Sequence, residues 1–516
     1  MVLFINKKKD TMEKIKYLHG LTTYWNYGGG DALFDIRQHG TEIPYTYPEE
    51  TFGFKTQRAF ADNFRFHYGN PNNTSPSGDG RLMVDRTAQG WWTDEYLDMM
   101  KNQYGIKTIW CTAGKMGFHN TTGKRNKVNP IDDSADRMLE SSWKDAAELA
   151  KQIVIRYADD TAEHLDKVNV YAVDKPGDLW YLSNEPKAGL GTLDAIEIGN
   201  EWNFPAEWSN GKATLTPEEY AVFFKTCYDA IRSVSNIEII MGGGLGGVDN
   251  AYDYIPRFLN QLDKLYESKG EFMPTDFAIC FHWYMRDGGS SQSGGIRGAS
   301  PEEVNAYTIG KEMDAICQEW GLEGWYNTET GWSAAADGTL DTSKNSAPIQ
   351  EGLTQLESQA ALMQRLTLIW GACDYCKGIT YWHCKDYYDT GAFLNGGVRG
   401  PNGEPKPARD WSYDFINQWG DYYIKDFVDN GDETYEVTLY NDVDQFIVGW
   451  SNGVVVGEYT PVPKMISEVV EPPVPPQPPT PPNPILPDVI EVKSIEIQHS
   501  EGCDPIIING PIKLHL

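Results

Sequence analysis

Short apolar runs alternate with amphipathic segments along most of the chain. The apolar and alternating runs predict eight strands, at about 17–25, 63–68, 106–111, 195–199, 237–241, 276–284, 324–329 and 378–383. Helical spacing of apolar residues predicts helices between most of these strands, at 93–104, 143–157, 216–234, 252–266, 300–320 and 356–372, with a closing helix at 406–423. Eight strands alternating with helices indicate an α/β fold, a closed (β/α)₈ barrel.

Two of these helices carry clear start signals. Thr216 precedes Pro217 and two glutamates, so it fits an N-cap with proline at the first helical position and acids in the first turn. The segment Ser300-Pro-Glu-Glu303 has the same pattern. We therefore expect helices to begin at 217 and at 301.

The last quarter of the chain has a different pattern. Three alternating segments, 434–440, 445–450 and 454–459, predict a small antiparallel sheet, and Asn452-Gly453 is a favoured hairpin turn. The proline-rich stretch 471–487 predicts an extended linker. The predicted parts of the chain are an N-terminal extension (1–13), the barrel (14–425), the accessory sheet (426–466), the linker (467–488) and a short tail or the start of a further module (489–516).

Composition narrows the class of partner. The net charge of −30 would repel a nucleic-acid backbone or an anionic membrane at long range, and it favours neutral ligands. Aromatic residues make up 13% of the chain, which fits either a sugar-binding cleft or a large aromatic core. No apolar run is long enough for a secretion signal or a membrane helix. The linker nevertheless suggests attachment, so we expect an extracellular or cell-surface protein.

The eight cysteines are too sparse for a disulfide scaffold in 516 residues. Cys373 and Cys376 form a Cys-x-x-Cys pair, and His383-Cys384 follows, but the sequence contains no second such pair. Without a second pair, core cysteines on a helix and a strand are a simpler interpretation than a zinc site. We predict no metal and no cofactor.

Candidate chemistry lies where the predicted strands end, because barrel enzymes build their sites at the C-terminal ends of the strands. The residues at these ends are Trp25, Arg65, His67, Asn200, Glu201, His282, Tyr284, Glu329, Trp382 and His383. Two of them, Glu201 and Glu329, are carboxylates three strands apart that face one opening. Glycoside hydrolysis needs such a pair, one carboxyl group to protonate the leaving oxygen and one to act as nucleophile or base.

The set Asn200-Glu201, His282-x-Tyr284, Glu329 in Asn-Thr-Glu-Thr-Gly-Trp, and Trp382 resembles the retaining β-glycosidases of clan A, which are (β/α)₈ barrels. The resemblance covers residues 15–425. Arg65-Phe-His67 and the small C-terminal sheet look most like the family 39 type, and agarase-like and porphyranase-like members are also compatible. The chain departs from the usual family 39 motif Asn-Glu-Pro-Asn, because Trp202 follows Glu201.

The resemblance implies a role for each of these residues. Glu201 would be the general acid/base, with a pKa raised by desolvation, and Glu329 the nucleophile, ~5–5.5 Å away. Asn200 would bind the sugar 2-hydroxyl. Arg65 and Tyr284 would hold Glu329, with Arg65 keeping its pKa low. His282 would contact the substrate or Glu201. The other residues expected to contact or support the substrate are Trp25, Trp202, Trp332 and Trp382.

These observations predict a retaining β-glycoside hydrolase that cleaves a polysaccharide or oligosaccharide, with endo action favoured by the aromatic content and the long loops. The alternative is a catalytically inactive carbohydrate-binding or surface-attached structural protein on the same barrel. A protein that has lost activity would usually lack one carboxylate, and both Glu201 and Glu329 are present. The sequence therefore favours the enzyme.

Overall fold

The computed structural model describes residues 12–25, 53–61, 94, 96–112, 135–168, 187–203, 214–246, 248–287, 295, 297–386, 395–401, 403–468, 489–497 and 506–515. The chain divides into two compact units, Met1–Glu468 and Val469–Leu516. The first unit contains every residue of the candidate site.

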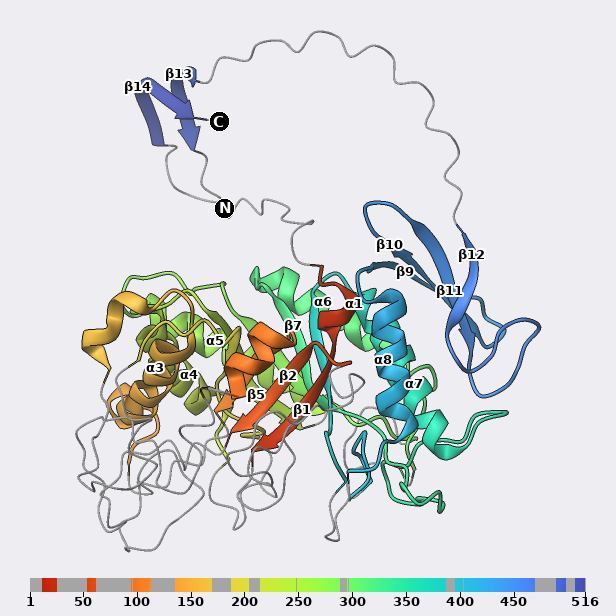
Figure 1. Ribbon diagram of the computed structural model, residues 1–516. Coiled ribbons are helices and arrows are strands. Elements are labelled where there is room, and N and C mark those ends of the chain that lie inside the picture. The colour runs from red at the N-terminus through yellow and green to blue at the C-terminus, as the bar shows by residue number, and fades with distance from the viewer. Residues whose placement is uncertain are drawn as a thin grey trace, which may run out of the picture. The chain divides into compact units, whose positions relative to one another are not determined.

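Eight parallel strands close into a barrel in sequence order, as the pattern predicts (Figure 1). The strands are β1 (His19–Trp25), β2 (Thr56–Ala61), β3 (Lys107–Thr112), β4 (Ala195–Glu197), β5 (Glu238–Gly246), β6 (Ala278–His282), β7 (Gly324–Thr330) and β8 (Cys376–Tyr381). Pairing of β1 with β8, His19 opposite Ile379, closes the ring. The fold is therefore a (β/α)₈ barrel.

Helices surround the barrel on its outer side (Figure 1). They are α1 (Ile15–Leu18), α3 (Lys144–Tyr157), α4 (Pro217–Arg232), α5 (Val248–Glu267), α6 (Ala306–Trp320), α7 (Gln355–Gly371) and α8 (Pro407–Trp419). The predicted helix at 93–104 includes a π-helical turn, η4 (Met99–Gln103), and two 3₁₀ segments are η5 (Glu140–Trp143) and η6 (Ala162–Lys167).

The helix start signals are confirmed in one case and shifted in the other. The Thr216 side chain accepts a hydrogen bond from the Glu219 amide and α4 begins at Pro217, as expected. Ser300 and Glu303 form the same reciprocal bonds, but α6 begins only at Ala306. Asn305, with φ of 53°, breaks the helical path between the cap and the helix.

The second strand is the main correction to the predicted barrel. The structure places β2 at Thr56–Ala61, whereas the predicted strand 63–68 lies outside the described residues. The segment Thr-Gln-Arg-Ala-Phe-Ala lacks branched apolar residues and carries a buried arginine, Arg58. A charged residue interrupts the apolar pattern of a strand. Its burial could not be predicted locally, because the residues that balance its charge lie on other strands.

Strand alternation sends successive side chains to the inside of the barrel and to its helix-covered outside. On β4, Ile196 belongs to the large core beneath the helices, while Ala195 belongs to a smaller cluster inside the barrel. The same alternation directs Glu197 inward. The members of the inner cluster are Ile109, Ala195, Ile240, Ala278, Cys280 and Tyr326.

A four-stranded antiparallel sheet follows the barrel, in the order β12-β11-β10-β9. Its strands are β9 (Tyr423–Asp429), β10 (Thr434–Tyr440), β11 (Gln445–Ser451) and β12 (Lys464–Glu468). The expected strand at 454–459 is wrong, because an isolated bridge between Val456 and Tyr459 takes its place. The sheet gains β9 and β12, whose inward apolar positions are too few for a clear alternation.

Buried polar contacts join this sheet to the barrel. Arg365 on α7 contacts Glu302 through Nε at 2.9 Å and through a second nitrogen, and donates to Gln350 at 2.7 Å and to Asn452 at 2.8 Å. Trp450 on β11 donates to Glu302 at 2.7 Å. We call these five residues the Arg365 cluster. The cluster connects the sheet, through Trp450 and Asn452, to Arg365 on α7 and to Glu302 and Gln350 of the barrel. Each of these side chains has a hydrogen-bond partner within the cluster.

In the second unit, β13 (Val489–Ile497) and β14 (Ile506–His515) pair antiparallel, with a register shift between Val492 and Ser494. Among the described residues, no helix combines the length and the apolar character needed to span a membrane.

Candidate active site

The turn after β4 places Asn200 and Glu201 at the mouth of the barrel. Gly199 has φ of 96°, and a Cβ there would collide with the Trp202 indole, so the turn requires glycine. The Gly199 amide donates to Thr112 at 2.9 Å. Glu201 itself has φ of 43°, an uncommon conformation for a residue with a side chain, and such strain is concentrated at functional sites.

A chain of hydrogen bonds fixes a proton next to Glu201. Thr328 donates its hydroxyl proton to Glu197 at 3.0 Å, so it must accept from Nε2 of His282, 3.0 Å away. The other ring nitrogen, Nδ1, lies 2.8 Å from Glu201. This contact needs one proton, held either by Glu201 or by the imidazole. The His282–Glu201 pair therefore stores the proton that a general acid requires.

Glu329 ends β7 beside this pair and has different partners. Tyr284 donates to one of its oxygens at 2.6 Å, and Arg58 donates to the other at 3.3 Å. His282 Nδ1 lies 3.6 Å from Glu329. One carboxylate oxygen of Glu201 and one of Glu329 lie within 4.8 Å of each other. Glu329 is thus surrounded by donors, whereas Glu201 shares a proton.

Arg58 on β2 links three strands beneath the carboxylates. Its Nε and Nη2 atoms bind Glu197 at 2.6 and 3.0 Å, and Nη2 also donates to Asn200 at 2.6 Å and to the Cys111 sulfur at 3.2 Å. Arg58 and Glu197 are both fully buried. Neither residue was predicted from the sequence to belong to the site. The one available signal was a glutamate inside the apolar run 195–198, where a barrel interior would not tolerate an unpaired charge.

Burial dominates the electrostatics of Glu329 and raises its pKa to about 7. The positive charges of His282 and Arg58 and the Tyr284 hydrogen bond lower this pKa, while the charge of Glu201 raises it further. Arg65, which was expected to keep this pKa low, lies outside the described residues. Arg58 directs its strongest bonds to Glu197, so it offsets the burial of Glu329 incompletely.

This raised pKa predicts an unusual pH dependence of stability. The native state holds the Glu329 proton more tightly than the unfolded chain does. The resulting contribution of protonated Glu329 to the free energy of unfolding is full below pH 4.5 and is lost as pH rises through about 7. Relative to wild type, Glu329→Gln should gain up to about 3 kcal/mol of unfolding free energy between pH 4 and pH 8. Urea unfolding of both proteins across this range tests it, and a constant difference would contradict it.

No protein-family model matches the chain, and no curated protein sequence matches it either. The fold is similar to that of a family 39 glycoside hydrolase from Bacteroides cellulosilyticus WH2, with a TM-score of 0.50, 14% identity, and 85% of this chain and 72% of that chain covered. A family 39 enzyme from Xanthomonas axonopodis pv. citri gives a TM-score of 0.50 and 13% identity, with 87% and 75% covered. The chain therefore shares the (β/α)₈ barrel fold of these glycoside hydrolases.

Within this barrel, the predicted set of site residues is only partly brought together. Asn200, Glu201, His282, Tyr284 and Glu329 form one connected cluster. Arg65 lies outside the described residues, and Arg58 donates to Glu329, a contact that was expected of Arg65.

The tryptophans have different fates. Trp382 follows β8 and is half-buried, so its predicted role beneath the sugar stays a prediction. Trp25 ends β1, but its side chain is outside the described residues. The structure buries Trp202 completely against Phe223, and it leaves Trp332 only 1% exposed with its indole donating to Ala299. These last two are core residues with no surface to offer a substrate, which corrects their predicted role.

Glu201, His282 and Glu329 form the group in the described part of the chain whose spacing could hold a metal ion. The hydrogen bonds argue against a cation there. The lone pairs of Glu329 accept from Tyr284 and Arg58, and the guanidinium of Arg58 would repel a metal. The chemistry of these residues fits proton transfer and nucleophilic attack.

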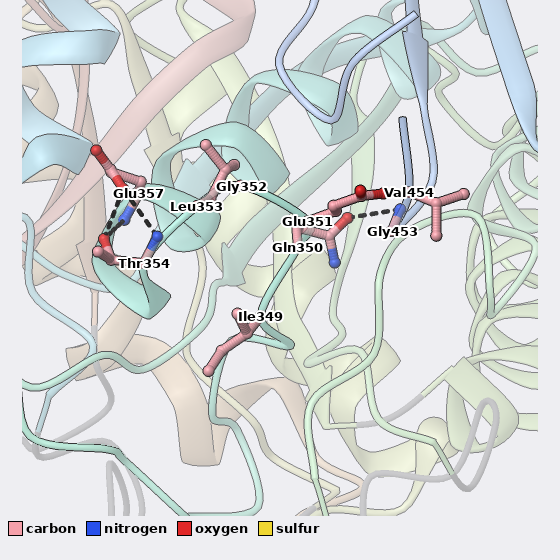
Figure 2. A pocket seen from close by; sticks show the side chains of 9 residues that line it. All are labelled: Ile349, Gln350, Glu351, Gly352, Leu353, Thr354, Glu357, Gly453 and Val454. Carbon is pink, nitrogen blue, oxygen red and sulfur yellow. Dashed lines mark hydrogen bonds between the residues drawn. The ribbon is translucent and has the colours of Figure 1, made fainter. Parts of the chain in front are cut away.

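An open pocket of about 660 Å³ lies apart from the carboxylates, between the loop that precedes α7 and residues 453–454 (Figure 2). Its lining shares no residue with the carboxylate site, and Gln350 in it belongs to the Arg365 cluster. The two glutamates in it are already engaged, since Glu351 accepts from the Val455 amide and Glu357 caps α7 with Thr354. The side-chain oxygen of Gln350 accepts hydrogen bonds from the Gly453 amide and from Arg365, so it is engaged as well. The pocket is therefore a gap where the accessory sheet packs against the barrel, and its polar groups are already used within the protein.

Proposed function

We propose that this chain is a retaining β-glycoside hydrolase acting on a polysaccharide or oligosaccharide. The observation that carries the proposal is the pair of buried carboxylates, within 4.8 Å of each other, at the ends of β4 and β7. Retaining enzymes hold their carboxyl groups ~5–5.5 Å apart, whereas inverting enzymes need ~6.5–9.5 Å to admit water. The short separation supports a double displacement.

In the first step, an oxygen of ionised Glu329 attacks the anomeric carbon and the glycosidic bond breaks. Glu201 passes its proton to the leaving oxygen, and His282 stabilises the resulting carboxylate at 2.8 Å. In the second step, Glu201 takes a proton from water, the water oxygen attacks the anomeric carbon, and Glu329 leaves as a carboxylate. The sugar retains its configuration and Glu201 regains its proton.

Asn200 supports this assignment. Arg58 donates to its side-chain oxygen at 2.6 Å, which fixes the orientation of the amide. The NH₂ group is then left to donate to a sugar hydroxyl beside the anomeric carbon. Such a contact strengthens as charge develops in the transition state. Asn200 would therefore bind the 2-hydroxyl, as the resemblance implies.

The stereochemistry of the first product tests the mechanism. The protein is incubated with a panel of plant, algal and bacterial β-glycans, and ¹H NMR follows the anomeric signals before mutarotation. We expect the β-anomer to appear first, and an α-anomer would refute the retaining mechanism. Product sizing on the same samples tests endo action. Binding of a glycan without any hydrolysis would favour the inactive alternative.

A polymeric substrate accords with a location outside the cell, which we propose together with attachment through the proline-rich segment 471–487. Fractionation of the source cells, with detection of the protein by antibody, tests both statements.

A further inference from the structure

Arg286 is a buried cation just beyond the carboxylate site. His282 at the end of β6 and Tyr284 two residues later both contact the carboxylates. Arg286 comes two residues after Tyr284. Its backbone bridges to Gly298, and its side chain is only 6% exposed. Nε donates to Asn345 at 2.8 Å, in the connection that follows β7. Arg286 therefore lies between the ends of β6 and β7, on the face of the barrel that carries Glu329.

The other buried arginines of the described chain show what Arg286 lacks. Arg58 binds Glu197, Arg156 binds Asp94 through two nitrogens at 2.9 and 2.7 Å, and Arg365 binds Glu302. Each of these guanidinium groups has a carboxylate partner. Arg286 has none among the described residues, and the amide oxygen of Asn345 carries no charge to balance it.

Two terminal nitrogens of Arg286 remain available. Neither of them forms a hydrogen bond with the described residues, and neither is among the polar atoms sealed away from solvent without a partner. Burial lowers the pKa of Arg286, and the charge of Tyr284 acts in the opposite direction. A guanidinium with two parallel donors and no counter-charge matches the geometry of a carboxylate or sulfate group. An anion from outside the chain would complete this site.

We propose that Arg286 binds an acidic group of the substrate, so that the enzyme selects a glycan carrying carboxylate or sulfate groups. The inference rests on the proposed function, since Arg286 lies two residues after Tyr284, which donates to the proposed nucleophile. The net charge of −30 opposes a polyanion only at long range, because salt screens charges beyond ~8 Å at physiological ionic strength. A contact with a buried guanidinium is screened far less. The substrate is thus anionic despite the acidic surface.

Binding is measured with the Glu329→Gln protein, so that no hydrolysis is required. Affinity electrophoresis compares polygalacturonate, a sulfated galactan and a neutral galactan of similar length. We expect one acidic polymer to retard the protein more strongly than the neutral one, and which polymer does so distinguishes carboxylate from sulfate. Arg286→Met should weaken that binding ~10–100-fold. The affinity of Arg286→Lys should lie between that of the protein with Arg286 and that of Arg286→Met, because lysine keeps the charge and loses the paired donors.

The matched control is Arg257→Met, which removes the same charge from the outer surface of α5, where Arg257 pairs with Glu218 and Asp253. It should leave binding unaltered. Equal loss of acidic and neutral glycan binding in Arg286→Met would indicate a purely structural role and overturn the proposal, as would preferential binding of the neutral polymer. Retaining hydrolysis of a neutral glycan that is insensitive to Arg286→Met would overturn the subsite alone, leaving the proposed function intact.

Discussion

Replacing Glu329 with alanine is expected to reduce glycoside hydrolysis roughly 10⁴-fold or more, because the variant cannot form the covalent intermediate. The substitution also removes the group that Tyr284 and Arg58 contact, so a small cavity with two donors remains. The 2.8 Å contact between His282 and Glu201 does not involve the Glu329 side chain, so the general acid stays in place. The loss should therefore appear in kcat, measured at substrate saturation.

Azide separates the roles of the two carboxylates. In Glu329→Ala, azide can enter the cavity and attack the anomeric carbon on the face that Glu329 used, giving a glycosyl azide of inverted configuration. In Glu201→Ala, azide attacks the glycosyl–enzyme in place of water and gives the retained configuration. Glu218→Ala, on the outer surface of α4, serves as the activity control. Identical azide products from both variants would contradict the assignment.

Replacing Arg58 with methionine is expected to destabilise the protein by about 3–5 kcal/mol, because it leaves the Glu197 carboxylate buried without its partner. The same change frees Asn200 and removes one donor from Glu329, so activity should also fall at least ~10²-fold. Chemical unfolding and kcat measure the two effects on one preparation.

A double variant, Arg58→Met with Glu197→Leu, tests whether these effects have separate causes. Removing both charges leaves an apolar pair of similar volume, which should restore most of the lost stability. Activity should stay low, since Asn200 and Glu329 still lack their donor. Recovery of activity in the double variant would show that Arg58 serves stability alone.

The sequence predicted the barrel because seven of its strands are apolar enough to be recognised without their neighbours. The second strand was misplaced since the segment around Arg58 resembles a polar loop, whereas Asn63-Phe-Arg-Phe-His-Tyr68 alternates like a strand. The accessory sheet was recognised from β10 and β11, whose pattern is regular. Its outer strands were missed because Lys464–Glu468 is largely exposed and offers little pattern.

The residues of the candidate site could be predicted where a reactive side chain directly follows a predicted strand. Glu201 and Glu329 follow apolar runs, and position alone singled them out. Glu197 and Arg58 were not predictable, because their pairing joins residues 139 positions apart inside the barrel. The burial of Trp202 was equally hidden, since it depends on the left-handed turn at Gly199.

The position of β12 has a mechanical consequence. It is the edge strand of the accessory sheet and the last element before the proline-rich segment 471–487. Tension applied through that segment would reach β12 first, and its five residues can peel from β11 one pair after another. The Arg365 cluster would meanwhile hold β11 to the barrel. We therefore expect a pull on that segment to detach β12 before it disturbs the barrel.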